Sequence, residues 1–211
     1  MGRYLGAKCK SCRRAGAKLY LKGERCLGDR CTLELRNFPP GPRRRRRGKT
    51  TDYGIHLREK QVMRRMFGIG ERQFRNYFVH AKRIPGVTGE ELVRLLERRL
   101  DNVVFRSGLA DSRTQAKQLV SHRHFWVNGR VVDRPSFLVH PGDVVEVKSE
   151  RRNRPYYRNL KERGLDALPA DFWISLDPEQ LRAEVKRLPN ADEMEENFQH
   201  LLVVEYYSNR V

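Results

Sequence analysis

The sequence has no long hydrophobic run and no recognisable targeting segment at its start. No stretch approaches the ~18 consecutive apolar residues of a membrane-spanning helix, which excludes a transmembrane protein. The N-terminus lacks the apolar core of a signal peptide, and Gly6 stands where a myristoylation signal needs Ser or Thr. We therefore expect a cytoplasmic protein whose four cysteines are not in disulfides. Hydrophobic residues make up only 38% of 211 residues, which favours two modest cores over one large one.

Acidic residues are fewer than basic ones, and they are distributed unevenly along the chain. The chain has 26 Asp or Glu against 44 Lys or Arg, a net charge of +18, and 33 of the basic residues are arginine. Residues 1–50 hold 16 basic and three acidic residues, whereas residues 165–211 hold four basic and ten acidic ones. Clustered positive charge attracts polyanions, and the arginine fork matches phosphate oxygens. An arginine-rich composition with solvated charges is the simpler alternative, but the clustering favours nucleic-acid binding.

Apolar residues at helical spacing predict three helices in the first half of the chain. They cover about residues 52–67, 71–82 and 88–105. Thr88 and Glu91 form a capping-box pair at the start of the third helix, which either continues to residue 105 or divides near residue 98. These apolar faces are typical of a helix-bundle core and contain no cofactor-binding pattern.

A fourth helix is predicted for residues 113–121, with Ser112 and Gln115 as its capping pair. The period then changes from helical to alternating, and Asn128-Gly129 lies between two short strands, the pattern of a tight hairpin. The remaining expectations are a turn at 141–143, strands at 144–148, 172–176 and 201–207, a short helix at 178–187, and a helix or linker at 150–164.

The cysteines form two close pairs near the N-terminus. Cys9 and Cys12 are followed, after a short loop, by Cys26 and Cys31. This spacing is typical of a structural zinc site with four sulfur ligands and no open position for a catalytic water. Nearby basic residues would favour thiolate over thiol. A redox dithiol, an iron–sulfur cluster and unligated cysteines remain alternatives, because spacing alone does not identify a metal.

Five consecutive arginines at residues 43–47 follow a Pro-rich stretch at residues 37–42. The stretch cannot be a helix or a central strand. The arginines repel one another, so we expect them to stay extended until a polyanion neutralises them.

Several segments together resemble the S-four RNA-binding domain. They are Leu100-Asp101-Asn102-Val103-Val104-Phe105-Arg106, Ser112-Arg113-Thr114-Gln115-Ala116-Lys117-Gln118-Leu119-Val120, Val127-Asn128-Gly129 and Pro141-Gly142-Asp143. The N-terminal Met1-Gly2-Arg3-Tyr4, the cysteine knuckle and residues 58–61, 71–75 and 204–208 extend the match over nearly the whole chain. The chain is identified as a member of the S-four family of bacterial small-subunit ribosomal proteins, in its zinc-bearing form.

The resemblance implies an α+β protein. We expect an N-terminal zinc knuckle, a helical lobe, and an S-four RNA-binding lobe with a small antiparallel sheet packed on helices. The expected boundaries are 1–42 for the zinc module, 43–97 for the basic arm and helical lobe, completed by 187–211, 98–160 for the S-four domain, and 161–211 for an extension that returns to the helical lobe.

The resemblance also implies the function. Members bind the five-prime domain of small-subunit ribosomal RNA early in assembly, line the path by which messenger RNA enters the subunit, and contact ribosomal protein S-five, an interface linked to decoding accuracy. Other small-subunit proteins are further expected partners. No membrane or small-molecule substrate is expected. The only expected cofactor is one structural zinc ion held by Cys9, Cys12, Cys26 and Cys31.

Carried over residue by residue, the resemblance predicts an RNA face on the fourth helix and the hairpin, with further contacts in the first half of the chain. The predicted RNA-binding residues are Arg3, Arg13, Arg14, Arg43, Arg44, Arg45, Arg46, Arg47, Lys49, Arg72, Arg113, Lys117, His122, Arg123, Asn128 and Arg130. Backbone N–H groups of residues 112–115 could also face a phosphate. Ordinary solvated surface charge is the alternative for any single member.

An enzyme is the chief rival interpretation. Arg99-Leu100-Asp101 is similar to the signature of pseudouridine synthases, some of which carry an S-four domain. Here Asp101 lies inside the expected RNA-binding unit, and too little chain remains for a catalytic domain. We expect Asp101 to form an ion pair on the helix surface or to orient Arg98 or Arg106, and we expect no enzymatic activity. A regulator that binds its own messenger is compatible with the ribosomal role.

Overall fold

The computed structural model describes residues 4–42, 51–165, 168–194 and 198–208. The chain divides into two compact units, which agrees with the two cores that its composition predicts. Unit 1 comprises residues 1–93 and 195–211, and unit 2 comprises residues 94–194. Within the described ranges, no helix is long and apolar enough to cross a bilayer.

Unit 1 begins with three short helical elements joined by tight turns: α1 (Lys8–Ala15), η1 (Gly23–Cys26) and α2 (Thr32–Leu35). α1 ends where Gly16 adopts a left-handed conformation, φ 78°, and donates its N–H to the Cys12 carbonyl. The Arg13 Nε donates to the Phe38 carbonyl at 2.9 Å, and the guanidinium lies 4.7 Å from the centre of the Phe38 ring. These contacts hold the end of the segment against α1.

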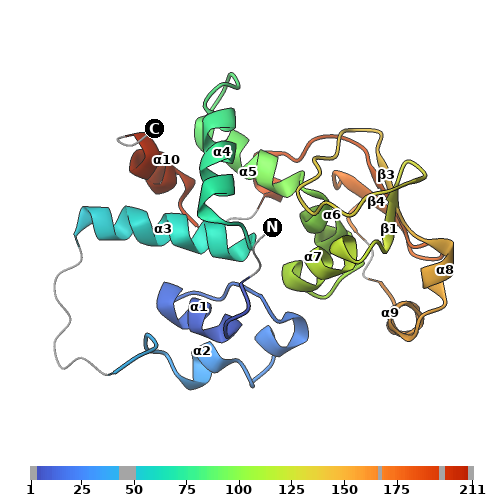
Figure 1. The fold of residues 1–211 in the computed structure, drawn as a ribbon, viewed down its shortest axis with the longest axis horizontal. Helices are drawn as coiled ribbons and strands as arrows, with labels where there is room; N and C mark the ends of the chain where they lie inside the picture. The colour runs from blue at the N-terminus through green and yellow to red at the C-terminus, as the bar shows by residue number, and fades with distance from the viewer. Residues whose placement is uncertain (1–3, 43–50, 166–167, 195–197, 209–211) are drawn as a thin grey trace. The chain divides into compact units, whose positions relative to one another are not determined.

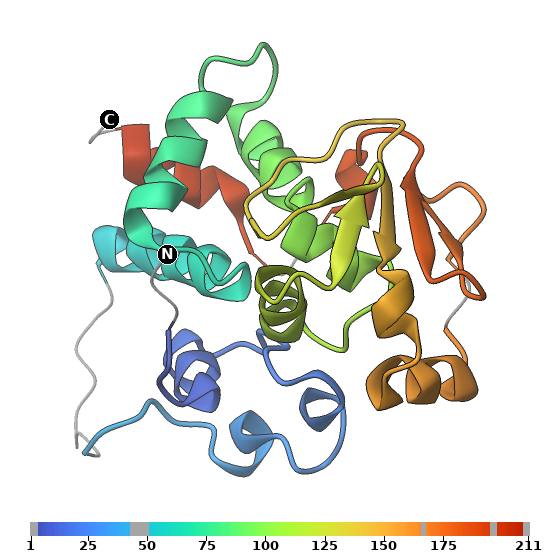
Figure 2. The ribbon, with the colours of Figure 1, turned by 45° about the vertical axis from the view of Figure 1, so that its right-hand side comes forward.

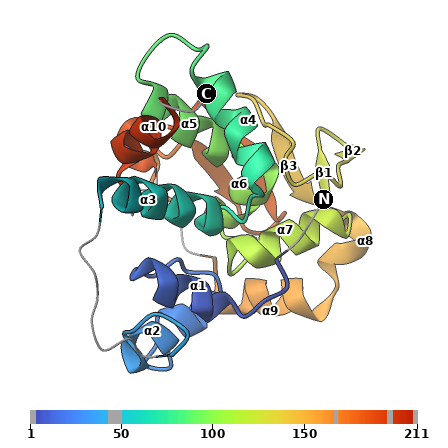
Figure 3. The same ribbon diagram turned by 60° about the vertical axis from the view of Figure 1, so that its left-hand side comes forward.

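Longer helices make up the rest of unit 1: α3 (Asp52–Met66), α4 (Glu71–Ala81), the start of α5 (Thr88–Glu97), and α10 (His200–Ser208). Thr51 caps α3, because its Oγ1 accepts the Gly54 N–H at 3.2 Å. α10 lies beside α3 although they are far apart in sequence (Figures 1 and 3). Met63, Phe74 and Phe78 are buried in the core between these helices.

The strand predicted for residues 201–207 is wrong, because these residues form helix α10. Val203 and Tyr207 are buried at helical spacing, and the Tyr207 ring stacks on Phe78 with the ring centres 4.8 Å apart. The Tyr207 hydroxyl donates to Glu71 Oε1 at 2.8 Å. Packing and this hydrogen bond override the strand propensity of the β-branched and aromatic residues.

Unit 2 is built on a five-stranded antiparallel sheet with strand order β2-β1-β3-β5-β4. Figure 2 shows this sheet with helices packed beside it. The strands are β1 (Phe125–Val127), β2 (Arg130–Val131), β3 (Val144–Val147), β4 (Ile174–Asp177) and β5 (Arg182–Val185). Asn128 and Gly129 have φ values of 50° and 75°, the left-handed pair that a two-residue hairpin requires. The predicted hairpin is therefore confirmed.

One apolar core joins the sheet to α6 (Leu100–Arg106), α7 (Arg113–Ser121) and α9 (Pro155–Arg163). It contains Val104, Val120, Phe125, Val145 and Trp173, each at most 1% exposed. The observed bounds of α7 match the prediction. The α+β class of the second lobe is likewise confirmed.

Residues 161–194 depart from the expected organisation. The predicted helix at 178–187 is wrong, because Ala183 and Val185 alternate with exposed neighbours and β5 pairs with both β3 and β4. The extension thus completes the sheet of unit 2, and only residues 195–211 belong to unit 1. Residues 187–211 were expected to complete the helical lobe, but residues 187–194 belong to unit 2. The Arg187–Glu193 ion pair, at 2.6 Å, stabilises this part of the segment.

The predicted third helix divides into α5 and α6. Between them Arg99 takes an extended conformation, φ −66° and ψ 138°, and forms a β-bridge with Leu138. The Leu100 N–H donates to the Phe137 carbonyl at 2.8 Å, and the Val139 N–H donates to the Arg98 carbonyl at 2.9 Å. These two bonds replace the backbone hydrogen bonds of a continuous helix and stabilise the interruption between α5 and α6.

Candidate nucleic-acid interface and metal centre

Side chains of Ser112 and Gln115 cap the N-terminus of α7. Ser112 Oγ accepts the Gln115 N–H at 3.3 Å, as the capping pattern predicts. The Gln115 side chain accepts the N–H of Asp111, at 2.9 Å, instead of that of Ser112. Two of the backbone donors near the predicted phosphate position are therefore already used within the chain.

Arg113 is not on the outward face where the sequence placed it. Its side chain is buried, its Nε donates to Asn102 Oδ1 at 2.8 Å, and its guanidinium lies 4.6 Å from the centre of the Phe105 ring. The first helical turn of α7 packs against α6, so this arginine joins the two helices. A direct phosphate contact by Arg113 does not fit this burial.

Arg113 belongs to a network of buried charges that sequence reasoning missed. Glu97, which is 0% exposed, accepts two bonds from Arg106, at 3.0 and 2.8 Å, and one from the Asn102 amide. Asn102 thereby links Glu97 to Arg113. The only signal in the sequence is the run of charged and amide residues within otherwise apolar helices.

Asp101 is also buried, contrary to the expectation of a helix-surface pair. Its carboxylate accepts bonds from Arg99 Nε at 3.0 Å and Nη2 at 2.7 Å, and Arg99 is 0% exposed. The Asp101 N–H donates to the Pro135 carbonyl. The partner is Arg99 instead of the predicted Arg98 or Arg106, because the extended residue before α6 points its side chain back to the first turn.

The other predicted cations of unit 2 remain at the surface. His122, Arg123 and Arg130 are exposed, and Lys117 is half-buried. Arg123 pairs with Asp133 at 3.1 Å, which ties the end of α7 to the segment that follows β2. These four side chains form the candidate interface.

Asn128 supports this interface from within the chain. Its Nδ2 donates to Asp143 Oδ1 at 2.7 Å, and its Oδ1 accepts the Val144 N–H at 2.8 Å. Asp143 Oδ2 also accepts the His140 N–H at 2.7 Å. The amide therefore locks the hairpin turn to the neighbouring turn, and its predicted RNA contact competes with these bonds.

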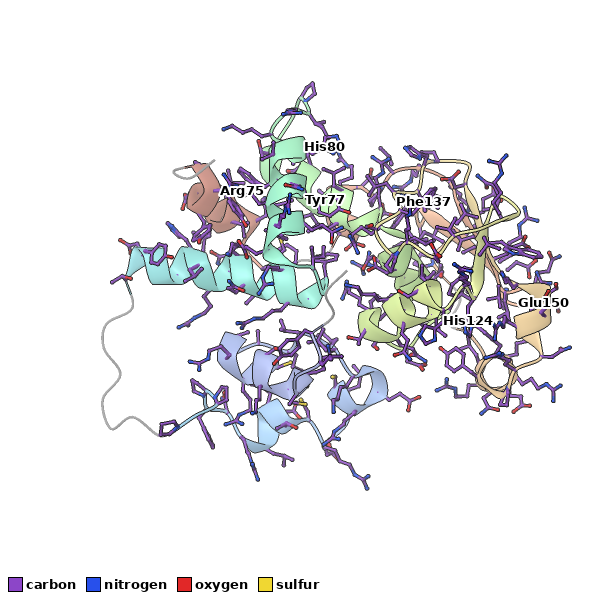
Figure 4. The ribbon with its side chains drawn as sticks, in the orientation of Figure 1. Arg75, Tyr77, His80, His124, Phe137 and Glu150 are labelled. Carbon is purple, nitrogen blue, oxygen red and sulfur yellow. The ribbon has the colours of Figure 1, made fainter. Side chains whose placement is uncertain are left out.

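Unit 1 holds the remaining predicted cations. Arg13 is engaged with Phe38, Arg14 is exposed with its Nη2 at 3.4 Å from the Pro40 carbonyl, and Arg72 is exposed on the first turn of α4. Along α4, exposed Arg75 and His80 flank the buried Tyr77 (Figure 4). Arg3, Arg43, Arg44, Arg45, Arg46, Arg47 and Lys49 lie outside the described residues.

The four cysteines line one small cavity in unit 1, with a volume of about 20 Å³. Cys12, Cys26 and Cys31 are buried, and Cys9 is half-buried. Among the described residues, no three His, Cys, Asp or Glu side chains come together as a ready ligand set for a metal. The four sulfurs suit Zn²⁺ by their chemistry, but the cavity would have to close around the ion.

The protonation of Cys12 differs from the expectation. Burial raises the pKa of this thiol, and the nearby Cys26, Cys9 and Cys31 raise it further, whereas a hydrogen bond from the Leu19 backbone lowers it. The neighbouring basic residues therefore do not make Cys12 a thiolate by themselves. A metal ion would have to displace the proton.

Comparison with known proteins places the chain in a family. A family profile described as "Ribosomal protein S4/S9 N-terminal domain" matches residues 3–97, and one described as "S4 domain" matches residues 98–145. "Small ribosomal subunit protein uS4" of Pelotomaculum thermopropionicum is 50% identical over 208 residues, which cover 99% of this chain and 100% of the relative. "Small ribosomal subunit protein uS4A" of Symbiobacterium thermophilum is 51% identical with the same coverage. Relatives this similar along their whole length, joined to an S4 domain with exposed cations, show that the chain belongs to the small ribosomal subunit protein uS4 family.

Proposed function

We propose that this protein is a structural component of the small ribosomal subunit in the cytoplasm and binds small-subunit ribosomal RNA directly. The single observation that carries the proposal is the basic surface of exposed His122, Arg123 and Arg130 and half-buried Lys117 on an S4 domain. The surface cations suit phosphate groups, and the buried ones hold the scaffold beneath them. Binding should read backbone and shape, since A-form RNA hides its base edges in a narrow major groove.

The resemblance to the S-four family supports a more specific role. The protein would bind the five-prime domain of the RNA early in assembly and nucleate its folding. It would line the path by which messenger RNA enters the subunit and contact ribosomal protein S-five, and so influence decoding accuracy. Repression of its own messenger is a compatible addition. We propose no enzymatic activity, because the relatives are ribosomal proteins and the Asp101 carboxylate is held by Arg99.

Binding to the RNA is tested with the full chain and a transcript of the small-subunit five-prime domain. We expect tight binding whose log K falls linearly with log salt, with ~0.7–0.9 added to the slope for each phosphate contact. Co-sedimentation with small subunits through a moderate salt wash is the second readout. Equal affinity for an unrelated RNA of the same length at every salt concentration would refute a specific ribosomal role.

We further propose one structural Zn²⁺ per chain, held by Cys9, Cys12, Cys26 and Cys31. The shared cavity and the four sulfur donors support this proposal. Metal analysis of protein purified without chelator should find close to one equivalent, and Cys12→Ser should lose it. Chelation should disorder residues 1–35 and leave the two main cores folded, as measured by amide hydrogen exchange. Four freely titrating thiols in native, metal-free protein would contradict the proposal.

A further inference from the structure

A second group of cations lies in unit 2 on the segment that follows β3, next to His124, and none of its members is among the predicted RNA-binding residues. His124 is buried at the start of β1, its Nδ1 lies 3.1 Å from the Tyr157 hydroxyl, and its carbonyl accepts the Lys148 N–H at 3.0 Å. These contacts join the first residues of β1, the end of β3 and α9. They hold the backbone of these segments in place around His124.

The cations on this backbone come from the end of β3, the short helix α8 (Ser149–Arg152) and the start of α9. Arg154 and Arg158 are exposed, and Arg151 and Lys148 are half-buried. In the described part of the chain, no carboxylate pairs with the guanidinium of Arg151, Arg154 or Arg158. Residues 148–158 contain five basic residues and one acidic one, so the segment carries uncompensated positive charge.

Acidic neighbours do not cancel this charge. The fifth basic residue, Arg152, is occupied by Glu146 at 3.3 Å and by the Val147 carbonyl at 3.0 Å. Glu150 is exposed on α8 (Figure 4) and is the one carboxylate within the segment. Three arginines and one lysine therefore remain for an external anion.

Arg154 and Arg158 form a short row of exposed arginines at the start of α9. Arg154 is the N-cap of α9, and its carbonyl accepts the Arg158 N–H at 3.1 Å. A separation of four residues at the start of a helix corresponds to about 6 Å along its axis. Tyr157 and Leu160 are buried on another face and anchor the helix in the core.

The pKa of His124 reflects the cations near it. Burial lowers the pKa of the His124 imidazole, and the positive charges of Arg151, His122 and Lys148 lower it further. Positive charge from the segment after β3 therefore reaches the buried imidazole. Such a concentration of charge costs folding free energy unless a polyanion neutralises it.

We propose that Lys148, Arg151, Arg154 and Arg158 form a second surface for the RNA phosphate backbone, made of other residues than the interface of Lys117, His122, Arg123 and Arg130 and adjoining it near His122. Arginine suits this role because its fork binds two phosphate oxygens at once. Tyr157, the ring between Arg154 and Arg158 in the sequence, is 0% exposed and is therefore closed to stacking by a base. The occupant is therefore the backbone of structured RNA, read without base contacts. This inference rests on the proposed function.

The test compares two full-length variants that each lose two positive charges from unit 2. Arg154→Ala with Arg158→Ala removes the exposed row, whereas Arg182→Ala with Lys186→Ala removes two exposed cations of β5 and its end. The probe is a transcript of small-subunit ribosomal RNA over a range of salt. We expect the first variant to bind more than fivefold more weakly, with the salt slope reduced by about 1.4–1.8, and the second to bind as the wild type does. Arg154→Lys with Arg158→Lys keeps both positive charges and should therefore keep most of the salt slope of RNA binding. This variant is the control for an effect of the substitutions on folding.

The outcomes separate the inference from the function on which it rests. If the wild type fails to bind the transcript, the proposed function fails and the inference with it. If the wild type binds and the Arg154, Arg158 variant matches it in affinity and slope, the second surface is refuted alone. Unchanged RNA binding with loss of a small-subunit protein from the assembled particle would assign the row to an acidic protein partner and overturn the inference. If the alanine variant is destabilised, hydroxyl-radical footprinting of the RNA bound to the wild type and to the lysine variant is the deciding measurement. If cleavage tethered to residue 154 or 158 reaches no part of the RNA backbone in either complex, the second surface is refuted.

Discussion

Unit 2 has arginines both in its interior and on its surface, and the two groups differ in their hydrogen-bond partners. Inside, Glu97, Asn102, Arg106 and Arg113 are bonded to one another and fix α6 against α7. Outside, residues such as Arg130 are exposed around the same two helices and the hairpin. We therefore expect the buried arginines of this unit to build its scaffold and the exposed ones to be the candidates for RNA contact. Each of the following predictions tests that division.

Glu97→Ala should have the largest effect on stability. It leaves Arg106 and Asn102 without their buried acceptor, and breaking a buried ion pair in this way costs about 3–5 kcal/mol. Urea unfolding followed by circular dichroism measures the loss. Glu150→Ala removes an equal charge from the surface and should change the free energy of unfolding by less than about 0.5 kcal/mol. A similar loss for both variants would show that the network contributes nothing of its own.

Arg113→Ala and Lys117→Ala separate the two roles on one helix. Arg113→Ala should lower the free energy of unfolding by about 2–3 kcal/mol, because it removes a charged hydrogen bond to buried Asn102. Lys117→Ala should change it by less than about 1 kcal/mol and should instead reduce the salt slope of RNA binding by ~0.7–0.9. If a folded Arg113→Ala protein shows that reduced slope, Arg113 contacts phosphate after all, and the burial argument is wrong.

This pair also shows what the sequence can and cannot predict. The bounds of α7, its cap at Ser112 and the hairpin at Asn128-Gly129 depend on neighbouring residues, and all three were predicted correctly. The position of Arg113 depends on Asn102, which lies on another helix, so its burial does not follow from the residues around it in the sequence. Residues 201–207 failed for the same reason, since Phe78 and Glu71 select the helix. Contacts between distant segments, not local propensities, limited the prediction.

The protonation of His124 gives a smaller effect with a defined sign. Burial first, then the charges of Arg151, His122 and Lys148, lower the pKa of His124 in the folded state. The unfolded state, with an ordinary histidine pKa of about 6.5, then binds the proton more readily. The stability is fully present above that pH and is lost as the pH falls toward the lower folded pKa.

Unfolding free energies at several pH values between neutral and mildly acidic should therefore fall more steeply for the wild type than for His124→Gln. The glutamine can still bond to the Tyr157 hydroxyl but carries no titrating group. The difference between the two proteins isolates His124 from the other histidines. Parallel curves for the two proteins would mean that His124 does not carry the acid sensitivity of unit 2.

Asp133→Ala should have the smallest effect on stability and tests the surface side of the comparison. The Arg123–Asp133 pair is exposed on both sides, so losing it should cost less than about 1 kcal/mol. The change frees Arg123 and removes a negative charge beside the candidate interface, so RNA affinity should rise by a few-fold at low salt. Asp192→Ala removes the same charge from an exposed position elsewhere in unit 2 and is the matched control. An equal gain for both variants would mean that only net charge matters. A gain for Asp133→Ala alone would place Arg123 at the RNA surface, since the released guanidinium acts only where phosphate can reach it.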